Sequence, residues 1–431
     1  MRIAVIGSGY AGTTLAAGLA DQGHDVTAVD IDEEIVSAIN DGRSPIHEPG
    51  LDSIIERTVG KTLVATTNYD EIVNAALIFV AVQTPSREDG SINVGPLRRA
   101  VEMAVETVLE GSERDDGHVI VIKSTVTPPE LSRLRDDIER LCADAAVEIE
   151  LAANPEFLRE GTAVEDFDAP DKVVFGVDSD EAAERLERAF ALIIEQVDPT
   201  VITTDPETAS MIKYANNAFL AAKISLINDL GNICKEFGID AYEVADAIGT
   251  DGRIEASFLR SGVGYGGSCF PKDVNAIIHS ATDSGYQPAM LEAAHHVNER
   301  QPERLLSLLD QHIDPAGTRV AVLGLAFKPG TDDIRNSRAI PVIEGLIDRG
   351  AQVVGYDPVA IDRMRERFPD IEYVGSAAEA LDGASAAIVV TDWDEFAALD
   401  GEFDAMERPI VIDGRRIISR RDDITYEGLT W

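Results

Sequence analysis

The sequence predicts an α/β protein with parallel sheets at both ends of the chain and helices between them. Three observations support this expectation. Residues 2–29 follow a strand–helix–strand pattern, residues 319–357 repeat it, and residues 206–237 are helical almost without a break. Strands that alternate with helices in this way pair in parallel, because each helix returns the chain to the same edge of the sheet. At 431 residues the chain is too long for one ordinary core, so we expect two or three domains.

The first sheet is expected to start with a strand at residues 2–6, a glycine turn, a helix over residues 13–20 and a second strand over residues 25–29. Helical stretches separate three further apolar strands, at residues 76–82, 118–122 and 148–152. We therefore expect a doubly wound parallel sheet of the Rossmann type, in a domain over residues 1–203.

The middle of the chain is expected to form a helical domain over residues 204–302. Its long helix is of a kind that serves as a spine between domains, and we expect it to contribute to a dimer contact. The one irregular stretch, residues 262–269, is glycine-rich. Residues 303–431 should form a second Rossmann-like domain. Its first turn lacks the three glycines of residues 7–12, so it should bind something other than a dinucleotide pyrophosphate, or nothing.

The charge of the chain excludes some partners. Its 37 basic and 78 acidic residues give a net charge of −41, which repels nucleic acid. The acidic excess is spread along the chain and lysine is scarce, which suggests a halophilic protein; a merely solvated acidic face is the alternative. No apolar run reaches the roughly 18 residues of a membrane span, so we expect no membrane contact and a cytoplasmic location. Three scattered cysteines argue against a disulfide framework and a zinc site, and we expect no metal.

A glycine pattern between the first strand and helix predicts a dinucleotide site. Gly7, Gly9 and Gly12 permit a tight turn and a close approach of backbone amides to a pyrophosphate at a helix N-terminus. Asp30 ends the next strand, where a carboxylate can bind ribose hydroxyls and repel a 2′-phosphate. We therefore expect NAD rather than NADP; the alternative is a glycine turn used only for packing.

Cys269 is the strongest candidate for chemistry. It follows four glycines within a short loop and precedes Lys272 and Asp273, so we expect an accessible thiol with a cation nearby. A nearby positive charge or a helix N-terminus favours the thiolate, which is the nucleophilic form. The alternative is a small buried apolar residue.

One segment resembles a known family. Residues 264–273, GYGGSCFPKD, are similar to the signature of the nucleotide-sugar 6-dehydrogenases, the UDP-glucose/GDP-mannose dehydrogenase family. The resemblance covers the whole chain, because further segments match in the expected order: residues 82–85 (VQTP), 123–126 (KSTV), 154–161 (NPEFLREG), 213–219 (KYANNAF) and 327–335 (FKPGTDDIR).

The resemblance implies a four-electron oxidation of a sugar alcohol to an acid, with two NAD molecules reduced in turn at one site. The Cys269 thiolate would add to the aldehyde, and the resulting thiohemiacetal would be oxidised to a thioester that water hydrolyses. Within the family, Ser268 and residues 270–272 favour UDP-glucose, oxidised to UDP-glucuronate, over the N-acetyl sugars. They discriminate less well against GDP-mannose.

The resemblance also implies roles for other residues near the reaction. Lys213 and Asn217 are four apart on one helical face and can offer donors to the sugar 6-oxygen; a surface lysine beside a packing asparagine is the alternative. Asp273 and Thr125 would lie beside water, and Glu156 near the reacting centre. The division of acid and base roles among the last three stays open.

Binding residues follow from the same resemblance. The expected cofactor contacts are Gly7, Gly9, Tyr10, Ala11, Gly12, Asp30, Thr84, Thr125, Glu160, Lys272 and Arg335. The expected substrate contacts are Glu156, Phe157, Leu158, Glu160, Lys213, Asn217, Arg253, Phe258, Leu259, Arg260, Gly266, Lys328 and Arg415. Arg253 would reach across the interface of a homodimer, and a solvated surface is the alternative for each exposed arginine.

Two functions of other classes share part of this pattern. A two-electron hydroxyacid dehydrogenase has the first sheet and the long helix, but needs neither a loop cysteine nor a third domain. A non-catalytic sensor of nucleotide sugars would bind without turnover.

Overall fold

The computed structural model describes all residues, 1–431, and divides into two compact units, residues 1–216 and 217–431. The division falls inside the long helix α9, Pro206–Glu236, which confirms the helix expected over residues 206–237. The three-domain division stays a prediction. Its boundary after residue 302 lies inside another continuous helix, α12, Ala289–Asp310.

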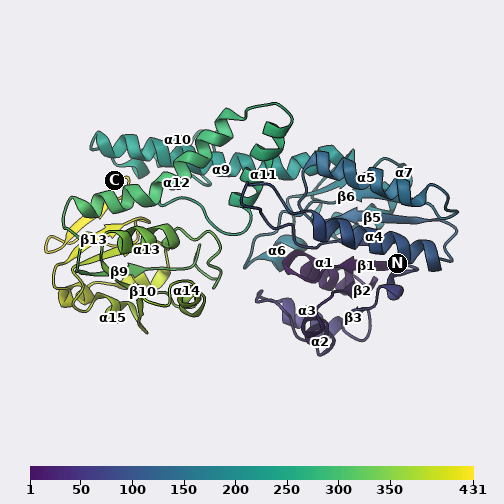
Figure 1. Cartoon of the computed structure of the whole chain (residues 1–431), viewed down its shortest axis with the longest axis horizontal. Coiled ribbons are helices and arrows are strands. Elements are labelled where there is room, and N and C mark those ends of the chain that lie inside the picture. The colour runs from purple at the N-terminus through teal and green to yellow at the C-terminus, as the bar shows by residue number, and fades with distance from the viewer. The chain divides into compact units, whose positions relative to one another are not determined.

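The first unit carries an eight-stranded sheet in the order β3-β2-β1-β4-β5-β6-β7-β8. All neighbours run parallel except β6 and β7, and the order reverses between β1 and β4, as in a doubly wound sheet. Its strands are β1 Arg2–Ile6, β2 Asp25–Val29, β3 Leu63–Thr66, β4 Leu77–Val80, β5 His118–Ile122, β6 Ile149–Ala153, β7 Lys172–Gly176 and β8 Thr200–Thr204. Its helices are α1 Tyr10–Asp21, α2 Glu33–Asn40, α3 Leu51–Thr58, α4 Gly95–Gly111, α5 Pro128–Cys142, α6 Ala163–Asp168, α7 Asp180–Ala189 and α8 Ala191–Val197, with a short 3-10 helix at Tyr69–Ile72 (Figure 1).

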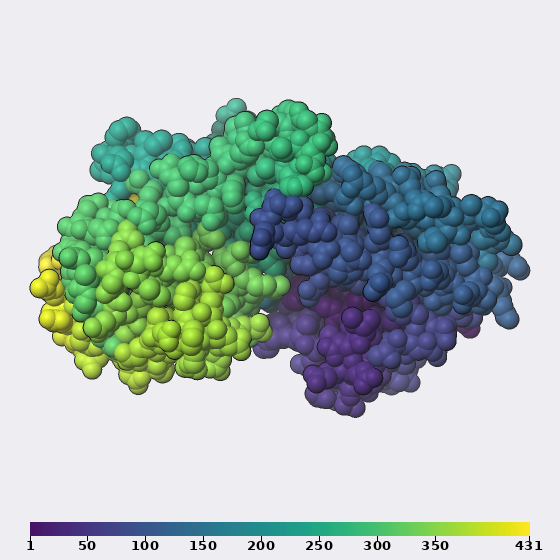
Figure 2. Space-filling view, in the orientation of Figure 1, coloured from purple at the N-terminus to yellow at the C-terminus, as the bar shows by residue number.

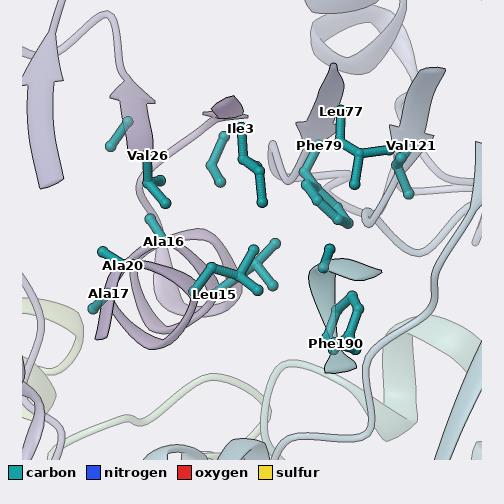
Figure 3. Close-up of a cluster of buried hydrophobic side chains, with 14 of the residues drawn as sticks. Ile3, Leu15, Ala16, Ala17, Ala20, Val26, Leu77, Phe79, Val121 and Phe190 are labelled. Carbon is teal, nitrogen blue, oxygen red and sulfur yellow. The ribbon is translucent and has the colours of Figure 1, made fainter. Parts of the chain in front are cut away.

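Alternation along the strands builds the core of this unit. Ile3 on β1 and Phe79 on β4 point to the same face of the sheet as Leu15 on α1, and all three are fully buried (Figure 3). The Phe190 ring contacts Phe79 edge-on, with ring centroids 6.4 Å apart. Burial of such side chains contributes roughly 1.5–3 kcal/mol each, which fixes the sheet that carries the glycine turn.

The second unit repeats the topology. Its six parallel strands lie in the order β11-β10-β9-β12-β13-β14, the same pattern as the first six strands of the first unit. The strands are β9 Arg319–Leu323, β10 Gln352–Tyr356, β11 Glu372–Tyr373, β12 Ala386–Val389, β13 Ile410–Asp413 and β14 Thr425–Gly428. The helices, besides α9 and α12, are α10 Ala241–Gly249, α11 Phe270–Asp283, α13 Ala339–Asp348, α14 Ile361–Arg367 and α15 Ala377–Leu381, with 3-10 helices at Asp394–Ala398 and Gly401–Ala405.

The helix α12 passes through Pro302 without ending. A proline inside a helix costs about 3 kcal/mol. Here Pro302 and the following Leu305 and Leu306 are buried, and the two leucines belong to the core of the second unit, so burial of this face holds the helix together.

Figure 2 shows the same view with all atoms drawn, the first unit in purple to teal and the second in teal to yellow. None of the helices is both long enough and apolar enough to cross a membrane.

Candidate active site

The glycine turn between β1 and α1 has the geometry that a pyrophosphate requires. Gly7 has φ +93°, and a Cβ on Gly12 would lie 1.8 Å from the Gly7 carbonyl oxygen, so neither position accepts a side chain. Gly9 caps α1, and a Cβ there would meet nothing within 4 Å. The amides of the first helical turn, at Tyr10 and Ala11, have no partner within the helix and are available to an anion.

Asp30 lies at the end of β2, next to this turn. Its carboxylate accepts hydrogen bonds from the backbone amides of Ser8, at 2.6 Å, and Asp32, at 3.0 Å. These bonds hold the carboxylate at the carboxyl edge of the sheet, where a ribose would lie. The turn and Asp30 therefore fit NAD.

A buried ion pair joins two of the expected catalytic residues in the first unit. The Lys213 ammonium lies 3.0 Å from Glu156 Oε1, and only 5% of Lys213 is exposed. Burial raises the pKa of Glu156, but the Lys213 and Lys123 ammonium groups and a hydrogen bond from the Leu158 amide outweigh it, so that this pKa lies below its ordinary value. Glu156 is therefore held as a carboxylate.

Two further lysines surround the same segment. Lys123 is buried and donates to Asn154 Oδ1 at 2.8 Å, and burial lowers its pKa to about 8. The Lys172 ammonium lies 4.2 Å from the centre of the Phe157 ring, which Lys213 also approaches at 5.4 Å. Burial lowers the pKa of Lys172 as well. These lysines place an excess of positive charge around residues 154–157.

Thr125 lies beside Lys213 in a small cavity. The cavity has a volume of about 10 Å³, the space of one water molecule, and its lining includes Thr125, Ser210 and Lys213. Thr84 donates from its hydroxyl to the Thr125 carbonyl at 2.9 Å, which fixes the loop. Both threonines expected near the cofactor therefore lie together.

Cys269 begins helix α11 in the second unit. It occupies the N-cap position, and its side chain is exposed. The partial positive charge of the helix N-terminus favours a thiolate at this position. The Ser268 hydroxyl lies 3.6 Å from the sulfur.

Asp273 follows one turn later and is almost completely buried. Its carboxylate accepts a hydrogen bond from Asn217 Nδ2 at 2.6 Å and pairs with the Lys272 ammonium at 2.6 Å. The structure thus brings Asn217, Lys272 and Asp273 together at the start of the helix that Cys269 caps.

The glycine loop before Cys269 is held against a second loop of the same unit. The Gly267 amide donates to the Arg335 carbonyl at 2.8 Å, and Asn336 Nδ2 donates to the Gly267 carbonyl at 3.0 Å. A Cβ on Gly266 would lie 2.3 Å from the Asn336 carbonyl oxygen, so only glycine permits this approach. The Arg335 guanidinium is fixed by Asp333 at 2.6 Å.

The expected substrate loop after α10 is exposed in part. Arg253 pairs with Asp251 at 2.5 Å, and its side chain is 88% exposed. Phe258 has φ +63° and is 44% exposed. The Leu259 side chain instead packs in a small apolar cluster, so a contact to a ligand would come from its backbone.

Three other cations expected to bind substrate lie in the second unit. The Arg260 guanidinium pairs with Asp246 at 2.7 Å. Arg415 Nε donates to the Val390 carbonyl at 2.7 Å. The Lys328 ammonium lies 5.6 Å from the centre of its neighbour's phenyl ring, that of Phe327.

The turn after β9 has the same place in the second sheet as the glycine turn after β1 has in the first. The buried Asp357, at the end of β10, accepts from the backbone amides of Leu325 and Ala326 at 2.7 and 3.0 Å and from Trp393 Nε1 at 3.0 Å. Asp357 thus takes the place that Asp30 has at the first turn, and its carboxylate oxygen accepts from one more backbone amide of the turn.

Models of one family match nearly the whole chain. Residues 1–194 match the NAD-binding domain of the UDP-glucose/GDP-mannose dehydrogenase family, residues 207–300 its central domain and residues 321–420 its UDP-binding domain. The chain belongs to this family. It is therefore an NAD-dependent oxidoreductase of the kind that the sequence predicted, and NAD is its cofactor.

Individual members of the UDP-glucose/GDP-mannose dehydrogenase family are similar to this chain over its full length. A UDP-glucose 6-dehydrogenase of Haloferax volcanii is 56% identical, with all of both chains covered. One of Rhizobium meliloti is 38% identical over all of this chain and 98% of its own. The solved UDP-glucose dehydrogenase of Pyrobaculum islandicum superposes with a TM-score of 0.92 at 36% identity, covering all of this chain and 98% of that one.

Some residues at the site received no role from the sequence. Lys123 and Lys172 are two of them, and the scarcity of lysine, with only eight in the chain, is the one sequence signal that could have pointed to them. Nothing in the sequence singled out Glu48, a buried carboxylate that contacts the Tyr10 side chain.

Proposed function

We propose that the protein oxidises UDP-glucose to UDP-glucuronate through a thiohemiacetal and a thioester on Cys269, with reduction of two NAD per sugar. The observation that carries the proposal is an exposed thiol at the N-terminus of α11, one turn before a buried carboxylate that holds Asn217 and Lys272. The names of the full-length relatives support UDP-glucose as the substrate.

The first oxidation needs donors at the sugar 6-oxygen. We assign these to the Lys213 ammonium and the Asn217 amide, which follow each other by one turn on α9. NAD, when bound, supplies the hydride acceptor in both oxidations. Glu156, kept ionised by Lys213, is one carboxylate available to take the alcohol proton, and Asp273 is the other.

The cysteine keeps the half-oxidised sugar from leaving. The thiolate adds to the aldehyde carbon, the carbonyl oxygen takes a proton, and the product is a thiohemiacetal. Loss of the C6 hydride and the hydroxyl proton then gives a thioester. Water adds to the thioester carbon, the C–S bond breaks, and the acid and the free thiolate result.

Hydrolysis requires an activated water. The cavity at Thr125 has the volume of a single water molecule, and Asp273 is a buried carboxylate that can orient water or accept its proton. Such general base catalysis contributes about 100- to 10,000-fold.

The assembly that we propose is a homodimer formed through α9. Four exposed apolar side chains of this helix follow the spacing of one helical face, and the exposed Phe237, directly after its last residue, continues the stripe; the four are Phe219, Leu226, Leu230 and Ile233. An exposed apolar stripe of this kind is typical of a protein contact. Arg253, at the tip of the exposed loop, would then serve the partner's sugar.

Counting NADH per sugar tests the proposal. The pure protein is incubated with NAD and limiting UDP-glucose, GDP-mannose or a UDP-N-acetylhexosamine, and NADH is measured by absorbance. We expect two NADH per UDP-glucose. One NADH per sugar would instead indicate a two-electron dehydrogenase, binding without NADH would indicate a sensor, and preference for another sugar would reassign the substrate.

A further inference from the structure

Glu48 is a buried carboxylate without a cationic partner. It lies between α2 and α3 and is only 4% exposed. Its Oε1 accepts a hydrogen bond from the Ala163 amide at 2.6 Å, and its Oε2 accepts one from the Gly161 amide at 2.9 Å and one from the Tyr10 hydroxyl at 2.6 Å. Three donors from residues far apart in the sequence therefore converge on this one side chain.

Tyr10 connects Glu48 to two other segments. Its hydroxyl receives a hydrogen bond from the Gly161 amide at 3.0 Å and lies 2.9 Å from the Arg159 carbonyl. Burial and the bond to Glu48 raise the pKa of Tyr10, so the hydroxyl stays a donor. Tyr10 is also the first residue of α1, directly after the glycine turn.

We propose that Glu48 and Tyr10 are a pair of positioning residues that couple the NAD turn to residues 159–163. This segment carries Glu160, which the family resemblance implies as a contact of both the cofactor and the substrate. Gly161 has φ +87°, so the turn beside Glu160 adopts a left-handed conformation that the bonds to Glu48 and Tyr10 hold in place. The inference rests on the proposed function, because it assigns the pair to the same reaction.

The geometry requires a carboxylate rather than an amide. Each oxygen of Glu48 faces a backbone N–H, and a glutamine offers only one acceptor oxygen. In Glu48→Gln an NH₂ group would therefore face a donor and displace residues 159–163. A misplacement of about 1 Å at a reacting centre costs about 100-fold in rate.

The test is a double-mutant cycle in the full-length protein. Glu48→Gln, Glu160→Gln and the double variant are compared for kcat, for KM of NAD and of sugar, and for NAD affinity by calorimetry. We expect Glu48→Gln to lower kcat/KM by about 100-fold, and by less than about twofold when Glu160 is already replaced. Equal losses in both backgrounds would overturn the inference.

A matched control separates this role from loss of a fold contact. Glu150, on β6 of the first sheet, also accepts three donors, the Asp178 amide and the amide and hydroxyl of Ser179. We expect Glu150→Gln to keep wild-type kinetics even where its melting temperature falls. If Glu48→Gln does not fold, Tyr10→Phe, which keeps the ring, replaces it in the cycle.

Failure of the inference and failure of the proposed function give different results. Wild-type protein that forms two NADH per sugar while Glu48→Gln and Tyr10→Phe behave like Glu150→Gln contradicts only the inference. Wild-type protein that forms one NADH or none contradicts the proposed function. In that case weaker NAD binding in Tyr10→Phe and Glu48→Gln, but not in Glu150→Gln, still supports the coupling, and unchanged NAD binding overturns it.

Discussion

Cys269 differs from the other two cysteines in the position of its sulfur. Cys142 and Cys234 are half-buried, and burial raises the pKa of the Cys142 thiol, whereas Cys269 is exposed at a helix N-terminus. We predict that Cys269→Ala abolishes acid formation, because nothing then retains the aldehyde for the second oxidation. Mass spectrometry of the product and of the protein checks this.

Two further variants test the prediction for Cys269. Cys269→Ser, whose hydroxyl is a weaker nucleophile and a poorer leaving group, should accumulate an ester on the protein. Cys142→Ala should keep wild-type acid formation. Normal turnover in Cys269→Ala would exclude covalent catalysis by this residue.

Lys123 makes stability depend on pH in a defined direction. Its pKa falls from 10.5 to about 8 on folding, so the ammonium costs the folded state about 3 kcal/mol at pH 7. The unfolded chain holds this proton longer, so the wild type gains stability as pH rises from 8 to 10.5. In Lys123→Met this gain is absent.

Denaturant titrations across that pH range measure the effect. The free energy of unfolding of Lys123→Met minus that of the wild type should fall by about 3 kcal/mol between pH 7 and pH 11. Lys61→Met, at the exposed lysine, should show no such change. Parallel curves for Lys123→Met and the wild type would mean that Lys123 stays charged at little cost.

At the scale of elements, two glycines of the β1–α1 turn have different tasks: one permits the fold, and the other leaves space for the cofactor. We predict that Gly12→Ala destabilises the first unit by about 1–3 kcal/mol or more, because its methyl group would lie 1.8 Å from the Gly7 carbonyl oxygen. Gly9→Ala has open space and an ordinary φ of −75°, so it should fold normally yet bind NAD at least about 10-fold more weakly. Thermal unfolding and NAD titration check both.

The apolar stripe of α9 gives a prediction about assembly. Leu226 is 59% exposed in the middle of that stripe, so Leu226→Glu should place a charge in the dimer contact and give monomers in sedimentation analysis. Activity should fall with it, because Arg253 would lose the partner's sugar. Ile347→Glu, at an exposed isoleucine of α13, should leave the dimer intact. A dimeric Leu226→Glu would place the interface elsewhere.

The sequence predicted those elements best whose pattern is purely local. The bounds of β1, β2 and β5 match the expected residues, because each is an apolar strand next to a clear turn. The sequence did not indicate β3 or β7, because each offers an apolar run of only three residues, at 63–65 and 173–175.

Prediction of the site had the same limit. The motif residues around Cys269 and Lys213 carry chemistry that can be recognised in sequence. Glu48 acts only through Tyr10, 38 positions away, and through Gly161 and Ala163, 113 and 115 positions away. A local sequence pattern cannot indicate contacts between residues so far apart, so the pair of Glu48 and Tyr10 could be recognised only in the structure.

At the scale of the whole molecule, lysine and arginine side chains lie in different surroundings. Only one of eight lysines is exposed, and the others lie against backbone carbonyls, aromatic rings or carboxylates. Arginines instead form ion pairs with surface carboxylates. Arg421, for example, pairs with Asp400, Asp404 and Asp423. These exposed pairs are each worth roughly 0–1 kcal/mol, so they offset only part of the repulsion among 78 acidic residues.

This repulsion predicts how the fold responds to salt. With a net charge of −41, like charges oppose the compact state, and added salt shortens the distance over which they act from about 10 Å at 0.1 M to about 3 Å at 1 M. We therefore expect the melting temperature to rise with potassium chloride up to molar concentration, with most of the rise at low salt, where screening changes fastest. Sucrose at equal osmolarity is the control. It is excluded from the protein surface as stabilising solutes are, but it does not screen charges, so it should not reproduce the rise at low salt. A melting temperature that falls with potassium chloride would mean that the arginine pairs contribute more than the acidic surface costs.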